Sequence, residues 1–213
     1  MSEISRKKWR LFLKRIWPFS LIPFIDFVFA SGSLATGKIH ENSDFDVLIG
    51  VKENRIFTVR FFCFLIFSLL GWRRKKMSRD GDESDKICLN HFVTSKKYRL
   101  SSLKYNDYQK SLYANLVPIL GDKKLIQEFW DANKDWMEYR KEYLADYRHY
   151  YAEKKFYQKF LEYFLSGKAG DILEKVFKRI QMGFSERSAK TEINPNSRII
   201  FSDQELEFHP DPY

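Results

Sequence analysis

Residues 32–46 read Gly-Ser-Leu-Ala-Thr-Gly-Lys-Ile-His-Glu-Asn-Ser-Asp-Phe-Asp, and this stretch decides the fold. Apolar runs flank it at residues 27–31 and 47–51, and each has the length of a short strand. Residues i and i+2 of a strand point to one face, so Asp44 and Asp46 share a face and Phe45 lies on the other. Two carboxylates so close repel each other unless a cation lies between them. The spacing therefore predicts a metal site, and hard oxygen ligands of this kind suit Mg²⁺.

Gly32 and Ser33 directly follow the first apolar run. A turn at this place offers backbone N–H groups and a hydroxyl to a phosphate. A phosphate site beside a metal site is typical of a centre that handles nucleotides. The alternative is a plain hairpin in which residues 42–44 form a polar turn. That alternative explains the turn, but it does not explain Asp46, which is a charge inside an apolar strand.

This stretch resembles the signature of the DNA polymerase β-like nucleotidyltransferases, and most closely that of the small bacterial minimal nucleotidyltransferases. The signature is an apolar strand, Gly-Ser, a spacer, and Asp-x-Asp in a second apolar strand. Every position of the pattern is filled, by Gly32, Ser33, Ala35, Gly37, Ser43, Asp44 and Asp46. The resemblance covers about the first 95 residues. It implies transfer of a nucleoside monophosphate from a nucleoside triphosphate to an acceptor hydroxyl, with release of pyrophosphate.

The resemblance also assigns roles to residues. Asp44 and Asp46 would be catalytic and would hold Mg²⁺ or Mn²⁺. Gly32 would let the backbone approach the phosphates, and the Ser33 hydroxyl would bind a phosphate oxygen. The family places a third acid on the strand after the next helix, where this chain has Asn90. An amide oxygen can coordinate Mg²⁺, but it cannot accept a proton as a base.

Several alternatives follow from Asn90. The acceptor could be deprotonated by His91, by Glu83 or Asp85, or by water. The protein could instead be a weakened module of an antitoxin-like, regulatory kind, which binds a nucleotide or RNA without turning it over. Asn90 and His91 could also simply form hydrogen bonds within the sheet.

The charge of the chain favours a polyanionic partner. The formal net charge is +9, from 37 Lys and Arg against 28 Asp and Glu. Such a balance suits a nucleotide or a nucleic acid, although it also aids solubility alone. The acceptor is left open among a small molecule, a protein and an RNA. The densest basic run outside the N-terminus is expected in an exposed loop and consists of Arg73, Arg74, Lys75, Lys76 and Arg79.

Two apolar segments imitate membrane signals. The run from Ile16 to Ala30 follows a basic start, but Pro18, Pro23 and Asp26 interrupt it. The segment at 57–70 is short for a membrane span. We therefore expect no membrane partner and a cytoplasmic location.

The first half of the chain predicts the order helix, strand, strand, helix, strand. The expected helices lie at residues 3–16 and 54–70, and the expected strands at 25–31, 45–51 and 86–94. This order predicts an α+β fold, with a small mixed nucleotidyltransferase-like sheet packed on helices.

Helical patterns dominate after residue 101, so we expect an α-helical C-terminal region that forms the far wall of the active-site cleft. The expected divisions are a nucleotidyltransferase-like domain at 1–98, a helical domain at 99–190 and an extended tail at 191–213, which includes a short strand at 198–201.

Overall fold

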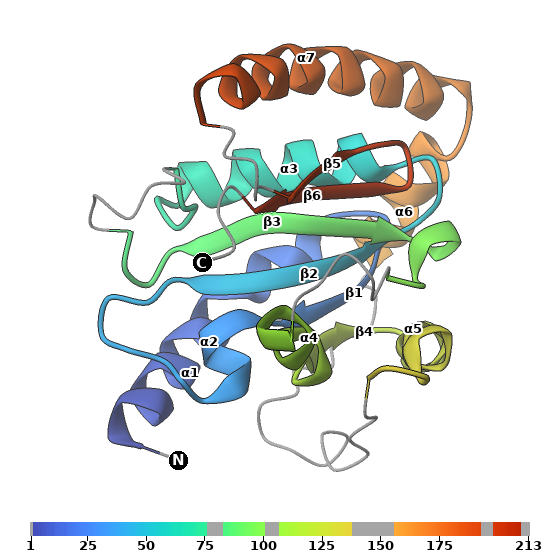
Figure 1. The fold of residues 1–213 in the computed structure, drawn as a ribbon. Coiled ribbons are helices and arrows are strands. Elements are labelled where there is room, and N and C mark those ends of the chain that lie inside the picture. Colours follow the sequence, from blue (N-terminus) through green and yellow to red (C-terminus); the bar gives the residue numbers. More distant parts are fainter. Residues whose placement is uncertain (1, 76–82, 101–106, 138–155, 193–197, 210–213) are drawn as a thin grey trace.

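A computed structural model describes residues 2–75, 83–100, 107–137, 156–192 and 198–209. These residues contain a six-stranded mixed sheet in the order β4-β1-β2-β3-β6-β5 (Figure 1). The strands are β1 (Ile25–Ala30), β2 (Phe45–Val51), β3 (Ile87–Thr94), β4 (Val117–Gly121), β5 (Arg198–Phe201) and β6 (Glu205–His209). Among these six strands, β2 and β3 are the pair that runs in parallel, and helix α3 (Ile56–Leu69) makes the crossover that a parallel pair needs. The predicted α+β fold is therefore confirmed.

Helices cover both faces of this sheet. The other helices are α1 (Glu3–Arg15), η1 (Trp17–Leu21), α2 (Gly32–Thr36), η2 (Ser95–Lys97), α4 (Asp107–Ala114), α5 (Lys123–Asn133), α6 (Phe156–Leu165) and α7 (Lys168–Glu192). Two of them begin at residues that favour a helix start. The Ser2 hydroxyl accepts from the N–H of Ser5, and the Asp122 carboxylate accepts from the N–H groups of Lys124 and Leu125.

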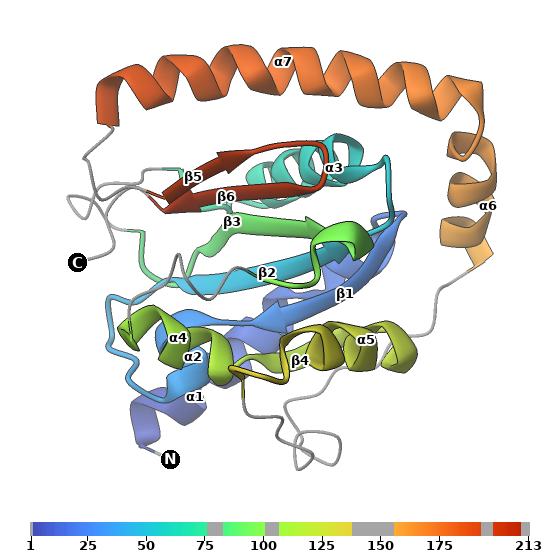
Figure 2. The same ribbon diagram turned by 45° about the vertical axis from the view of Figure 1, so that its right-hand side comes forward.

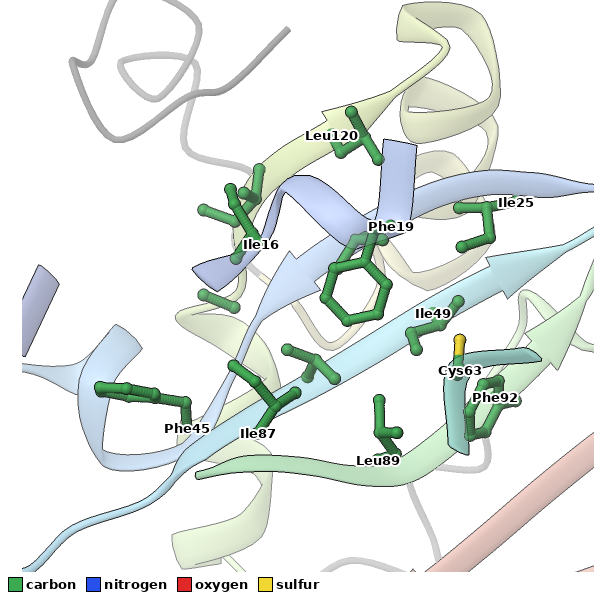
Figure 3. Close-up of a cluster of buried hydrophobic side chains, with 14 of the residues drawn as sticks. Ile16, Phe19, Ile25, Phe45, Ile49, Cys63, Ile87, Leu89, Phe92 and Leu120 are labelled. Atoms are coloured by element: carbon green, nitrogen blue, oxygen red, sulfur yellow. The ribbon is translucent and has the colours of Figure 1, made fainter. Parts of the chain in front are cut away.

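Alternate residues of β1 pack into two separate cores. Val28 and Ala30 belong to the core formed with α1, η1 and α3, part of which is drawn in Figure 3. Phe27 and Phe29 belong to the core formed with α4 and α5. Because successive strand residues point to opposite faces, the two cores lie on opposite sides of the sheet. The sheet is thus buried on both faces, as its long apolar strands require.

Helix α7 runs along α3 and secures it (Figure 2). The Glu174 carboxylate accepts hydrogen bonds of 2.9 and 2.8 Å from the N–H groups of Phe57 and Thr58, which begin α3. Further along, the Arg60 guanidinium donates to the Gln181 side chain at 2.7 Å. Helix α7 therefore braces the crossover helix between β2 and β3. None of the helices in the described part of the chain combines the length and apolar character needed to cross a membrane.

The structure differs from the sequence-based expectations in three elements. The Gly32–Ser33 turn is the first turn of the short helix α2. Residues 117–121 form an edge strand beside β1, where Pro118 is tolerated because an edge needs no complete set of N–H donors. The expected strand at 198–201 is β5, but it forms a hairpin with β6, which joins the main sheet through β3. A long helical pattern expected at 133–165 falls partly on residues 138–155, outside the described residues.

Candidate functional site

Asp44 and Asp46 lie at the start of β2, on the side predicted from their spacing. Phe45 and Val47 are buried in the core beneath α1 and α3, so Asp46 points to the opposite face of the sheet. Asp44 immediately precedes the strand, and both acids are half-buried. Their carboxylate oxygens and the Cys88 sulfur all lie within 4.8 Å of one another. The acid pair is therefore a real cluster.

Lys8 of α1 fixes the loop that leads into Asp44. Its ammonium group is buried and donates to the backbone oxygens of Glu41 and Ser43, the latter at 3.1 Å. The same group forms an ion pair of 2.7 Å with Asp85, which precedes β3. One buried cation thus ties together the two loops that enter β2 and β3.

Gly32 lies directly against Asp46. Its φ of +63° is a left-handed conformation that glycine adopts without steric cost. A Cβ at this position would lie 2.2 Å from Asp46 Oδ2, which is far inside van der Waals contact. The neighbouring N–H of Ser31 donates to the Asp46 backbone oxygen at 2.9 Å. Only glycine therefore allows the backbone at the end of β1 to touch the acid pair.

The environment of Asp46 disfavours its ionised form. Burial and the nearby charge of Asp44 raise the pKa of Asp46 from 3.8 to about 7, against the opposing effects of Arg74 and of hydrogen bonds from Cys88 and Asn90. Keeping Asp46 ionised therefore costs free energy, and a cation bound beside its carboxylate would reduce that cost. The metal site expected from the spacing of the two acids stays a prediction.

Asn90 lies beside the acid pair, as the sequence-based alignment expected. Its Nδ2 donates to Asp46 Oδ1 at 3.2 Å. A register shift makes this possible, since Asp46 pairs with Cys88 whereas Leu48 pairs with His91. The extra residue of this bulge brings Asn90 and His91 to the same face, because their neighbours Leu89 and Phe92 both enter the core on the other side.

The proposed substitutes for a third acid have other partners. His91 is buried, with Nδ1 2.8 Å from the Tyr113 hydroxyl and Nε2 3.4 Å from Glu205 Oε1. The Asp85 carboxylate pairs with Lys8, and a Glu83 carboxylate oxygen accepts from the Lys75 N–H at 3.2 Å. Among the described residues, the donor group that contains Asp44 and Asp46 includes no third carboxylate.

The donor set fits a hard divalent cation. Two carboxylates whose oxygens lie within 4.8 Å of each other suit Mg²⁺ or Mn²⁺. Burial, followed by the charges of Asp46 and Asp44, raises the pKa of the Cys88 thiol well above its usual value. The sulfur is therefore protonated and is a poor ligand beside the two carboxylates.

The loop residues of the motif have local roles. Ser33 is half-buried in α2, next to Gly32. The Ser43 hydroxyl accepts from the N–H of His40 at 3.0 Å, and Ser43 N–H donates back to the His40 carbonyl at 3.1 Å. Ser43 thus closes the turn, which agrees with its interpretation as a turn residue. Lys38 and His40 are exposed.

Two neighbours of the acid pair were not identified from the sequence. Arg74 Nη1 forms an ion pair with Asp44 Oδ2 at 2.6 Å. Cys88 lies two residues before Asn90, and the period of a strand could have placed it on the same face. The expectation of an exposed loop is therefore wrong for Arg73 and Arg74, which are half-buried. Lys76 and Arg79 lie outside the described residues.

The chain matches a known family model over most of its length. The family model described as "Nucleotidyltransferase domain" matches residues 6–143, which include most of α1 and all of β1, β2 and β3 together with the acid pair. Comparisons with curated proteins and with solved structures gave no match.

Proposed function

Because the chain belongs to the nucleotidyltransferase domain family, we propose that it transfers a nucleoside monophosphate from a nucleoside triphosphate to an acceptor hydroxyl. The contact between Gly32 and Asp46 carries this proposal. It brings the backbone at the end of β1 against the acid pair, an approach that a Cβ on residue 32 would prevent. A triphosphate and a divalent cation need these two features side by side.

Asp44 and Asp46 would hold Mg²⁺ or Mn²⁺, which when bound stabilises the charge on the phosphates. The Ser33 hydroxyl would donate to a phosphate oxygen, and Gly32 would let the backbone approach closely. The acceptor oxygen forms a bond to the α-phosphorus while the bond to pyrophosphate breaks. The proton of the acceptor hydroxyl passes to water. Asn90 would hold Asp46 in place through its 3.2 Å hydrogen bond.

One specific observation favours a second candidate, a module that binds a nucleotide or RNA without turning it over. The residue beside Asp46 on β3 is an amide, and an amide cannot act as a base. His91 and Asp85, which could have replaced that base, are engaged in other contacts. The complete acid pair and Gly32 favour the enzyme, so we keep the module as the alternative.

Transfer can be measured with triphosphates labelled at the α-phosphate. Each of the four nucleotides is incubated with the protein and Mg²⁺, with the protein itself, total RNA or small alcohols as the acceptor. If the protein is a nucleotidyltransferase, the wild type should give a labelled acceptor and an equal amount of pyrophosphate. Asp46→Asn should give neither product. Nucleotide binding without any labelled product or pyrophosphate would instead support the binding module.

Asn90→Asp distinguishes the two candidates. The new carboxylate would lie where Asn90 now contacts Asp46, and general-base catalysis contributes about 10²- to 10⁴-fold. A binding module should gain measurable pyrophosphate release. An enzyme that already deprotonates its acceptor efficiently by another route should gain little, or lose activity because a third negative charge disturbs the acid pair. If neither cation affinity nor turnover changes, the proposed position of Asn90 in the site is wrong.

A further inference from the structure

Arg74 is held in place by its backbone at the entrance of β3. Its N–H donates to the Ile87 carbonyl at 2.9 Å, and the Ile87 N–H donates to the Trp72 carbonyl at 2.7 Å. Arg73, which lies between Trp72 and Arg74 in the sequence, forms a parallel β-bridge with Ile87. These residues extend the sheet by a short segment, so the position of the Arg74 side chain is set by sheet hydrogen bonds.

The two adjacent arginines point to different surroundings. The Arg73 guanidinium lies over the Phe64 ring of α3, 4.5 Å from its centroid. The Arg74 guanidinium lies 2.6 Å from Asp44 and 4.0 Å from the Cys88 sulfur. The side chains of Arg74 and Asp44 are only 23% and 19% exposed. Alternation along an extended segment explains why one arginine faces the helix and the next faces the acids.

The charge of Arg74 is balanced by the acids that would hold the cation. Burial is the largest single effect and lowers the pKa of Arg74, but the charge of Asp44, the hydrogen bond to Asp44 and the charges of the neighbouring groups together raise this pKa by more, so the guanidinium keeps its positive charge. A divalent cation at Asp44 would compete with this guanidinium for the same carboxylate oxygen. The protein therefore carries its own counter-ion at the position where a metal is expected.

We propose that Arg74 holds Asp44 in the ligand-free protein and turns to the phosphates when nucleotide and cation bind. This inference rests on the function proposed above. A guanidinium binds phosphate oxygens through paired N–H groups, and the phosphates of a nucleotide at Gly32 and Asp46 would lie next to Asp44. Arg74 thus weakens cation binding before nucleotide arrives and strengthens nucleotide binding afterwards. The two ligands are expected to bind as a pair.

The test uses calorimetry on the full chain with two separate probes, Mn²⁺ alone and a nonhydrolysable nucleoside triphosphate alone. Arg74→Gln should bind Mn²⁺ about tenfold more tightly than the wild type and should bind the triphosphate about tenfold more weakly. Lys75→Gln is the matched control, because it removes the same charge from an exposed neighbour. This control should leave both affinities within about twofold of the wild type.

Arg74→Lys keeps the proposal testable if Arg74→Gln folds poorly. It retains the charge but loses the paired N–H groups, so Mn²⁺ affinity should stay near that of the wild type while triphosphate affinity falls. Unchanged affinities for both probes in a folded Arg74→Gln protein would overturn the role of Arg74. A wild type that binds no triphosphate even with Mn²⁺ would overturn the proposed function instead, and the Mn²⁺ titration would still test the competition at Asp44.

Discussion

At the scale of single residues, the two acids of the site are not equivalent. Asp44 is paired with Arg74, whereas Asp46 lies against Gly32 and has a raised pKa. Without metal at pH 8, Asp46→Asn should raise the free energy of unfolding by roughly 2 kcal/mol, and Tm by roughly 5 °C. Asp44→Asn should give a lower Tm than Asp46→Asn, because it removes the partner of Arg74. Thermal unfolding in chelator measures both, and a lower Tm for Asp46→Asn than for the wild type contradicts this account.

The pKa of Asp46 also predicts how stability depends on pH. Burial first, and then Asp44, raises this pKa from 3.8 to about 7, so the folded protein binds the proton more tightly than the unfolded chain does. The contribution of Asp46 to the free energy of unfolding therefore falls as pH rises from about 4 to about 7, and stays low above that. Denaturant titrations in chelator at pH 5 and pH 8 should differ less for Asp46→Asn than for the wild type. Equal differences in both proteins would show that Asp46 titrates normally.

Gly32 and Gly37 form a matched pair for testing the contact with Asp46. Both have positive φ, +63° and +77°, so alanine costs about 1–2 kcal/mol at either position. Only Gly32 adds a clash, because a Cβ at Gly37 meets nothing within 4 Å. Gly32→Ala should therefore be the less stable variant and should lose cation-dependent nucleotide binding, while Gly37→Ala keeps it. If the two variants behave alike in calorimetry, the close approach to Asp46 has no functional role.

At the scale of elements, the C-terminal hairpin is joined to the core by buried polar groups. His91 of β3 pairs with Glu207 of β6, and the Tyr113 hydroxyl of α4 contacts His91 and donates to Glu207 at 3.2 Å. Tyr113→Phe should lower the free energy of unfolding by about 1–3 kcal/mol, because buried polar groups lose a partner. Tyr163→Phe is the control, since Tyr163 is 82% exposed. Equal denaturation midpoints for the two variants would contradict the role given to this network.

The elements that the sequence predicts best are those with an uninterrupted pattern. Strands β1, β2 and β3 are apolar runs bounded by polar turns, and their predicted and observed bounds agree within one residue. Strand β4 was missed because its five residues lie between two helical patterns and include Pro118. Strand β6 was missed because Glu205 and Glu207 are buried acids, whose burial depends on partners distant in sequence.

At the scale of the whole molecule, the predicted parts of the site are residues close together in the sequence. The unpredicted parts depend on contacts between segments that are distant in the sequence. Asp44, Asp46 and Gly32 are neighbours within one motif, so spacing alone could bring them together. Asn90 required the correct register of β3, and the bulge beside it could not be read from the sequence. Arg74 looked like one charge in a basic run, because the Trp72–Arg74 segment extends the sheet only through hydrogen bonds to β3.

The central claim is that Asp44 and Asp46 form a cation site shared with a bound nucleotide. The most direct test is calorimetric titration of a nonhydrolysable nucleoside triphosphate, with and without Mg²⁺, into the wild type and into the double variant Asp44→Asn/Asp46→Asn. We predict that Mg²⁺ strengthens binding to the wild type and that this part of the affinity is absent in the folded double variant. Equal Mg²⁺-dependent binding to both proteins would contradict the claim.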